Sequence, residues 1–163
     1  MVNFLVCLQV FRRRPVMRTV IRLKCMELTP DQQQFVESLR SHKRTLHELR
    51  MQAQSLPRSL RAGALLHVFV DSNDYGDQQT AGRLLVDLQP TCPHPLEDVL
   101  DAIAPTWNVS VEELPFYLSD VFGPKLVADT ALTLASRFDE SDRRNRALGT
   151  VAWWLKRRIQ DGG

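Results

Sequence analysis

The residues with the clearest chemical potential lie near the end of the chain, where a tryptophan stands between two arginines. Four residues there are separated by four, three and four positions, so on a helix they share one face. They are Arg146, Thr150, Trp153 and Arg157. A guanidinium group can stack on an indole ring, and both residue types are enriched at binding hot spots. The spacing predicts a surface that binds a partner protein; internal packing of Trp153 is the less specific interpretation.

The same segment is rich in cations, which makes nucleic-acid binding the alternative function. An exposed indole can stack on a base, and a guanidinium can pair with phosphate. The residues that would serve this purpose are Arg143, Arg144, Arg146, Trp153 and Lys156–Arg158. We rank nucleic acid below a protein partner because of how charge is distributed along the chain.

Charge is distributed unevenly, so the formal net charge of +2 describes no single part of the chain. Residues 1–25 contain six basic residues and no acid, and residues 143–163 carry a net charge of +5. Between them, residues 63–142 contain fourteen acids and three bases, a net charge of −11. This acidic segment would repel phosphate. It would suit a basic partner or a loosely held cation, or simply form a solvated face.

The acidic loop Asp71–Asp77 is the place where spacing suggests a cation site. Aspartate at position 1, asparagine at position 3 and glycine at position 6 match the first half of an EF-hand loop. Position 5 is Tyr75, however, and position 12 is Gly82, where calcium needs a bidentate glutamate. We therefore expect a polar turn here, with a weak cation contact as the minor alternative. No metal ligand and no cofactor are expected.

Sequence signatures of catalysis are missing. The chain has no Gly-x-Ser-x-Gly, no Walker loop and no Gly-x-Gly-x-x-Gly, and its seven glycines leave little for a phosphate cradle. A helix start accounts for Glu112 and Glu113, and the pair Asp98 and Asp101 has no histidine beside it. No catalytic residue is predicted. The expected function is a non-catalytic protein–protein interaction or regulatory module, and an enzyme of unknown class is the third option.

A second candidate surface follows from a repeat over residues 29–56. Thr29, Pro30 and Gln32 form a capped helix start, and no glycine or proline follows until Pro57. Apolar residues, with one histidine among them, then recur at spacings of four and three, which predicts one long amphipathic helix with a narrow stripe. Such a stripe must dock on the rest of the chain or on a partner helix, including a second copy. The residues assigned to partner binding are Phe35, Leu39, Leu46 and Leu49.

The remaining apolar pattern is helical rather than alternating, which predicts an all-α fold. Capping residues, prolines and glycines divide it into segments. The expected helices are 58–71 (with a strand as the alternative for Leu65–Val70), 78–89, 96–104, 110–122, one from Pro124, and one from Asp139 or Ser141 to Gln160. The expected fold is a compact bundle of six or seven helices with one long N-terminal helix. The alternative is a helical-repeat-like stack of helix pairs.

Domain organisation and location follow from the basic segment at the start. Residues 1–25 are expected to be a leader that is disordered or not part of the fold, and residues 26–163 a single all-α domain. No apolar stretch reaches the roughly 18–20 residues of a membrane span. Three cysteines cannot form a closed set of disulfides, which favours a reducing, cytoplasmic environment.

Overall fold

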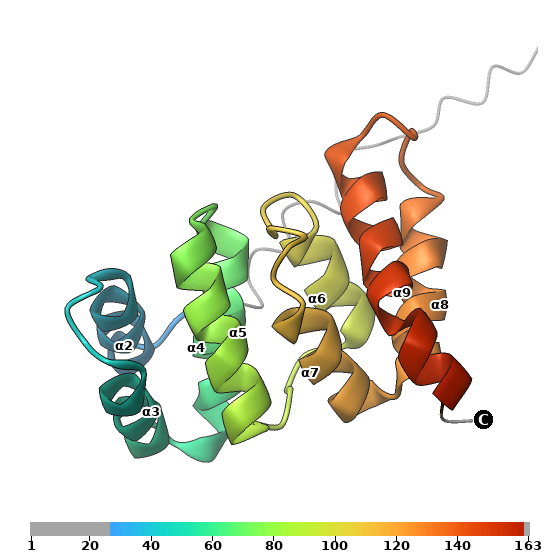
Figure 1. Ribbon diagram of the computed structural model, residues 1–163. Coiled ribbons are helices and arrows are strands. Elements are labelled where there is room, and N and C mark those ends of the chain that lie inside the picture. Colours follow the sequence, from blue (N-terminus) through green and yellow to red (C-terminus); the bar gives the residue numbers. More distant parts are fainter. Residues whose placement is uncertain (1–26, 162–163) are drawn as a thin grey trace, which may run out of the picture.

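All the regular structure in residues 27–161, the range that the computed structural model describes, is helical (Figure 1). The all-α prediction is confirmed. The leader predicted over residues 1–25 lies outside the described residues. The helices are α2 (Pro30–Arg40), α3 (Leu46–Ser55), α4 (Arg58–Asp71), α5 (Tyr75–Leu88), α6 (Leu96–Ile103), α7 (Glu113–Phe122), α8 (Pro124–Ala135) and α9 (Arg143–Asp161). None of these helices is both long enough and apolar enough to cross a membrane.

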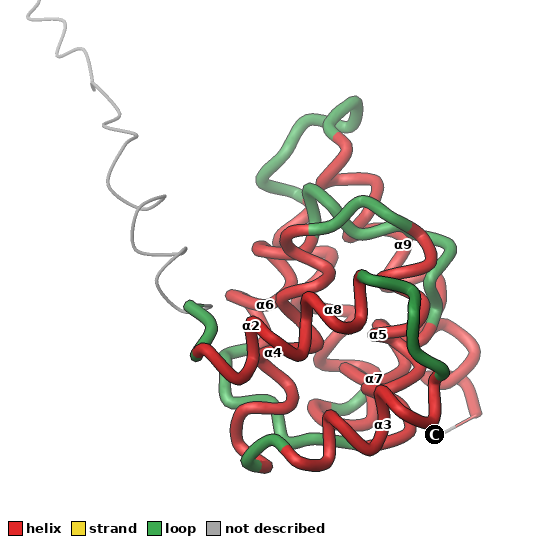
Figure 2. Tube along the Cα trace, turned by 90° about the vertical axis from the view of Figure 1, so that its left-hand side faces the viewer, coloured by secondary structure: helices red, strands yellow, loops and turns green. Residues whose placement is uncertain are grey.

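The helices follow one another along the molecule in two layers. One layer contains α2, α4, α6 and α8, the other contains α3, α5, α7 and α9, and within each layer every helix packs on the next. Figure 1 shows α2 and α3 at one end and α8 and α9 at the other, and Figure 2 looks along the molecule from the α2–α3 end. The described helices therefore pack as one bundle whose internal order is that of stacked helix pairs.

The buried apolar side chains of the described helices form one hydrophobic cluster that runs through both layers, from Phe35 in α2 to Leu155 in α9. Within residues 27–161, the bulkiest fully buried side chain is Trp107, which comes from the 104–112 connection between α6 and α7 rather than from a helix. Its indole N–H donates to the carbonyl of Val111 (3.2 Å), so the buried polar atom is satisfied within the connection itself. The buried ring holds this connection against the core.

The prediction of one long helix over residues 29–56 is wrong, because α2 and α3 divide that segment. Ser41 ends α2, and His42 adopts a left-handed backbone conformation with φ 52°. Thr45 then starts α3: its hydroxyl accepts from the N–H of Glu48 (3.3 Å), and the Glu48 carboxylate accepts from the N–H of Thr45 (2.7 Å). This second capping box competes with continuation of the first helix. The described residues therefore contain eight helices, one more than the largest number predicted.

The next two helices, α4 and α5, agree better with the sequence-based prediction. The predicted helix 58–71 is observed as α4, and the alternative of a strand is wrong. The next helix, α5, begins at Tyr75 instead of residue 78. It begins there because the Asp74 carboxylate caps it, accepting from the backbone N–H of Asp77 (2.9 Å).

The start of α7 differs from the prediction. The helix start expected at residue 110 is wrong, because α7 begins at Glu113. The Ser110 N–H donates instead to Oδ1 of Asn108 (3.1 Å), so Ser110 belongs to a turn of the 104–112 connection. Pro115 lies in the first turn of α7, where a backbone N–H has no acceptor within the helix. The connection is thus longer than expected, and it forms part of the candidate site.

Candidate partner-binding site

The site is built on α9. Asp142 precedes this helix, and its carboxylate accepts from the backbone N–H (2.8 Å) and the guanidinium (2.7 Å) of Arg144. These hydrogen bonds with Arg144 hold the pKa of Asp142 below its usual range, and a carboxylate is favourable at a helix N-terminus. Leu148, Val151 and Leu155 are buried in the core. Their burial fixes the rotation of α9 and leaves its opposite face toward solvent.

The connection between α6 and α7 lies beside α9 and is anchored by Gln78, a fully buried residue of α5. The Gln78 amide donates to the carbonyls of Thr106 (3.0 Å) and Ser72 (2.6 Å), and its oxygen accepts from the N–H of Asn108 (2.7 Å). The hydroxyl of Thr106 also donates to the carbonyl of Phe69 in α4 (2.6 Å). These buried hydrogen bonds hold the connection in one conformation.

Two side chains of α9 join the helix to this connection. Arg143 donates to the carbonyls of Thr106 (3.5 Å) and Trp107 (3.3 Å). Farther along the helix, the indole N–H of Trp154 donates to the carbonyl of Val109 (3.0 Å). Because the acceptors are all backbone carbonyls, these bonds fix the helix relative to the path of the connection.

Two hollows lie between α9 and the residues that face it. The first encloses about 440 Å³ and is lined by Trp107, Asn108, Val109, Arg143, Arg146, Ala147 and Thr150. The second encloses about 520 Å³ and is lined by Glu112, Phe116, Trp153, Trp154, Lys156 and Arg158. The hydrogen bond between Trp154 and Val109 joins the lining of one hollow to that of the other. We refer to the two hollows and their lining residues together as the α9 groove.

Trp153 is the most exposed of the large hydrophobic side chains in the described residues, with 65% of its surface accessible. Its ring meets Trp154 edge to face, with the ring centroids 4.8 Å apart. Trp154 in turn meets Phe116 of α7 edge to face at 6.2 Å. The three rings form a row from solvent toward α7, and the outermost ring has a large apolar surface that a partner could cover.

Positive charge surrounds these rings. Arg158 forms an ion pair with Asp120 (2.5 Å), so its charge already has a partner. Arg146 and Lys156 are exposed and form no ion pair with any residue of the described range. Among the described residues that line the two hollows, only Glu112 is acidic. The α9 groove therefore has a net positive charge and is complementary to an acidic ligand.

Three of the four residues predicted on the face of α9 line the groove. Arg146 and Thr150 line the first hollow, and Trp153 lines the second. The side chain of Arg157 lies outside the described residues. Internal packing, the less specific interpretation for the tryptophan, applies to the neighbouring Trp154, which packs partly buried against the core.

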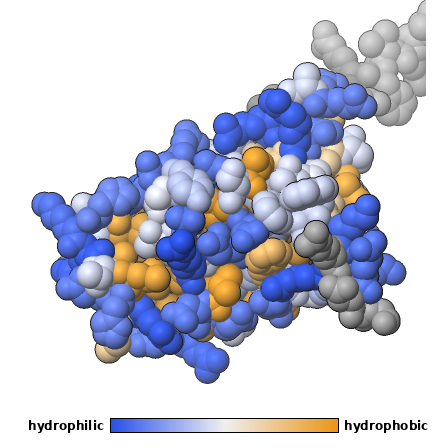
Figure 3. Space-filling view, in the orientation of Figure 1, coloured by the Kyte–Doolittle hydropathy of each residue, from blue (hydrophilic) through white to orange (hydrophobic). Residues whose placement is uncertain are grey.

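Most of the named residues of the apolar stripe predicted over residues 29–56 are buried in the core. Phe35, Leu39 and Leu49 are only 1%, 2% and 3% exposed, so the prediction that they form a free binding stripe is wrong. Leu46, the first residue of α3, is 43% exposed. On the face drawn in Figure 3, hydrophobic side chains show as separate patches among hydrophilic ones rather than as a continuous stripe.

Sequence reasoning missed the groove residues that come from outside α9, such as Val109 and Phe116. These residues face α9 only because the fold brings them there, so no local spacing could have identified them.

One of the cations considered for nucleic-acid binding, Arg144, does not line the α9 groove. Its guanidinium pairs with Asp142 (2.7 Å) and lies 4.0 Å from the centre of the Phe138 ring.

Comparison with known proteins suggests no function for the chain, so the function proposed below depends on the geometry of the α9 groove. No protein family, curated protein or solved structure matches the chain.

Proposed function

We propose that the chain is a non-catalytic interaction module that binds an acidic segment of a partner protein in the α9 groove. The observation that carries this proposal is Trp153, an indole that is 65% exposed at the edge of a hollow of about 520 Å³. Tryptophan is among the residues most enriched in binding hot spots. Covering the indole would supply apolar binding free energy, and Arg146 and Lys156 would favour carboxylates on the partner.

The rigidity of the groove also supports a binding role. Hollows of this size can accept an anchoring side chain of a partner. Their walls are held by the hydrogen bonds of Gln78, Arg143 and Trp154 to backbone groups. A surface fixed before binding loses little conformational entropy when a partner arrives, which raises affinity.

Nucleic-acid binding is the second candidate, because the same indole could stack on a base. The geometry supports it less. Arg144 and Arg158 are engaged by Asp142 and Asp120. The affinity that comes from phosphate contacts grows with the number of cations that make them. Of the cations considered for this role, the described ones that form no ion pair are Arg143, Arg146 and Lys156, and so small a number would make a weak phosphate-binding surface.

A peptide selection on the full chain tests the proposal. Peptides from a random displayed library are retained on the wild-type chain alone, and the affinity of the enriched peptides is then measured for the wild type and for the Trp153→Ala variant. We expect the enriched peptides to combine Asp or Glu with an aromatic or large aliphatic residue. Trp153→Ala should weaken their binding by about tenfold or more, a typical loss at a hot spot. Arg146→Ala should weaken binding mainly at low salt, because an exposed charge is screened at high salt.

Leu126→Ala is the matched control, since Leu126 is a large apolar residue that is 55% exposed on α8 and does not line either hollow. It should bind the selected peptides as the wild type does. Peptides that bind the Trp153→Ala variant as tightly as the wild type would contradict the proposal. A single-stranded oligonucleotide that binds only when Trp153 is present, with no peptide enriched, would replace it with the second candidate.

A further inference from the structure

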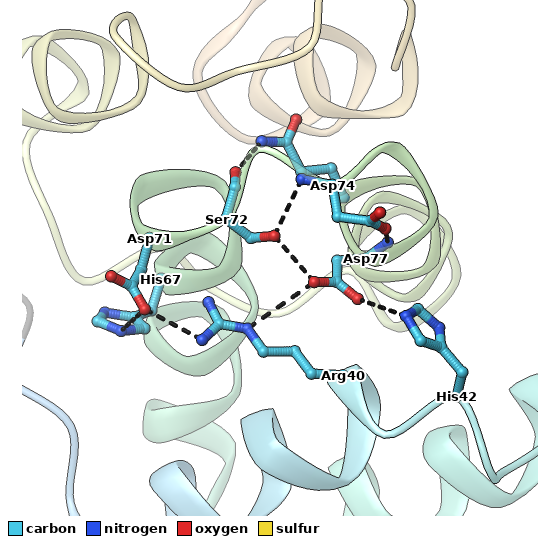
Figure 4. Close-up of polar contacts among 8 residues, drawn as sticks. Arg40, His42, His67, Asp71, Ser72, Asp74 and Asp77 are labelled. Atoms are coloured by element: carbon cyan, nitrogen blue, oxygen red, sulfur yellow. Dashed lines mark hydrogen bonds and ion pairs between the residues drawn. The ribbon is translucent and has the colours of Figure 1, made fainter.

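Three side chains that can ligate metal meet from two separate parts of the chain (Figure 4). His42 lies in the turn between α2 and α3, whereas Asp74 and Asp77 lie at the start of α5. One ligand atom from each residue lies within 4.8 Å of the other two. The sequence-based prediction considered only a weak cation contact within Asp71–Asp77, and it contained no histidine because His42 is distant in the sequence.

Asp77 gives this cluster a buried charged group. Its side chain is 8% exposed. Its Oδ2 accepts from the Ser72 hydroxyl (2.8 Å), but its Oδ1 accepts no hydrogen bond from any described residue. Oδ1 faces the imidazole of His42, whose Nε2 is 3.3 Å away (Figure 4). A buried carboxylate oxygen without a donor is unfavourable, so a cation at this position would satisfy it.

We propose that His42, Asp74 and Asp77 bind a divalent metal ion, and that zinc fits them best. Zinc takes imidazole nitrogen and carboxylate oxygen as ligands in a tetrahedron, with bonds of about 2.0–2.2 Å. Two ligand atoms of such a tetrahedron are about 3.4 Å apart. Nε2 of His42 and Oδ1 of Asp77 are already 3.3 Å apart. Asp74 supplies the third ligand, and water would complete the set, as in zinc sites with three protein ligands.

The local geometry leaves space for the ion beside Asp74. Oδ1 of Asp74 accepts from the N–H of Asp77 (2.9 Å), which orients the carboxylate and leaves its other oxygen for a metal. Gly76 lies next to it, and a methyl group there would come within 3.2 Å of Asp74 Oδ1 and 3.8 Å of His42 Cε1. The missing side chain at Gly76 therefore keeps open the space between two of the ligands.

The surrounding charges favour a cation. Arg40 contributes positive charge, but its Nη1 pairs with Asp71 (3.0 Å) and its Nε is 3.9 Å from Oδ2 of Asp77. His67 faces the same carboxylate of Asp71, with Nε2 3.9 Å away. The carboxylates of Asp71, Asp74 and Asp77 therefore have one arginine beside them. The net charge of the cluster is negative when both imidazoles are neutral. A bound divalent ion would offset that charge and join the α2–α3 turn to the start of α5.

Zinc titration of the full chain tests this inference, after a chelator has removed adventitious metal. A chromophoric chelator competes for the ion and reports the affinity. We expect His42→Ala and Asp77→Asn each to weaken binding by about 100-fold, since even residues that only support a metal ligand are worth about 10–100-fold. Zinc should also raise the thermal unfolding midpoint of the wild type, but not of His42→Ala. The His42 side chain is 61% exposed, so His42→Ala tests the site without removing core packing.

His47→Ala is the matched control, because His47 is an exposed histidine on α3 outside the cluster. It should bind zinc as the wild type does. Zinc that binds the wild type and His42→Ala equally, or that binds neither, would overturn the inference. The result is independent of the α9 groove, which lies on the last helix of the stack, so peptide binding and metal binding can each fail alone.

Discussion

The indole N–H of Trp154 donates to the backbone carbonyl of Val109 at 3.0 Å and so joins α9 to the connection between α6 and α7. The adjacent Trp153 has a different environment: its ring packs edge-on against Trp154 and remains 65% exposed. Two consecutive tryptophans therefore have separate roles. Trp154 supports the groove, and Trp153 exposes the apolar surface that we propose a partner covers.

This division predicts different effects of substitution on stability. Trp154→Ala should lower the free energy of unfolding by about 2 kcal/mol, because it removes partly buried apolar surface and a hydrogen bond. Trp153→Ala should change it by less than about 0.5 kcal/mol, as is usual for an exposed residue. Denaturant unfolding of the two variants measures both values. Equal losses would show that Trp153 is part of the core.

Gly82 in α5 and Gly149 in α9 differ in how much space lies beside them. A methyl group on Gly82 would lie 2.9 Å from Cβ of Glu113 and 3.3 Å from Cγ1 of Val111, whereas nothing lies within 4 Å of one on Gly149. Gly82→Ala should therefore destabilise the chain by about 1–3 kcal/mol. Gly149→Ala should stabilise it by about 0.5–1 kcal/mol through helix propensity. Thermal unfolding compares them, and a stabilising Gly82→Ala would contradict the close packing of α5 on α7.

The capping box of α3 predicts a stability contribution that depends on pH. Hydrogen bonds from the backbone and side chain of Thr45 lower the pKa of Glu48 below its ordinary value of 4.5. A carboxylate with a lowered pKa in the folded state stabilises that state above its ordinary pKa, and the contribution is lost as pH falls through the lowered value. Glu48→Gln should thus melt below the wild type at neutral pH.

The difference in melting temperature between Glu48→Gln and the wild type should shrink as the pH falls through the lowered pKa of Glu48. It should be small throughout, because Glu48 is exposed and water screens its charge. Melting curves across the acidic range test this, and a difference that does not change with pH would argue against an ionised capping box.

Gln78 should matter for both stability and binding. Gln78→Leu leaves the carbonyls of Ser72 and Thr106 and the N–H of Asn108 without their buried partner. Each such group costs about 1–3 kcal/mol, so the loss should be about 3 kcal/mol or more. Selected peptides should also bind more weakly, because the connection that lines the groove loses its anchor. Gln79→Leu is the neighbouring control, and a loss as large in that variant would contradict the assignment.

Helix type and most helix boundaries could be predicted from the sequence, because caps and apolar spacing act within a few residues. The exceptions are the starts of α5 and α7 and, above all, the split between α2 and α3. An uninterrupted repeat over residues 29–56 indicated one helix, but the local hydrogen bonds of Thr45 and Glu48 outweighed it. The signal was present as Thr-x-x-Glu, the same pattern type that marks the first helix start at Thr29.

The candidate site could be predicted only in part, because half of it is formed by residues that are far from α9 in the sequence. The face of α9 follows from helical spacing, which placed Arg146, Thr150 and Trp153 together. The opposing wall depends on Gln78 and Trp107, whose contacts fix the path of the 104–112 connection. The approach of His42 to Asp77 likewise depends on how the first helix pair packs on the second. Such contacts join residues far apart in the chain, so no pattern of local spacing contains them.

Trp153 is the residue of the α9 groove that we propose contacts the partner most closely. The chain has three tryptophans, and Trp107 and Trp154 donate their indole N–H groups to backbone carbonyls. In a nitrogen-15 spectrum of the full chain, titration with a selected acidic peptide should move the Trp153 indole signal most. The signal of the buried Trp107 should stay in place. A peptide that binds while the Trp153 signal does not move would contradict the account.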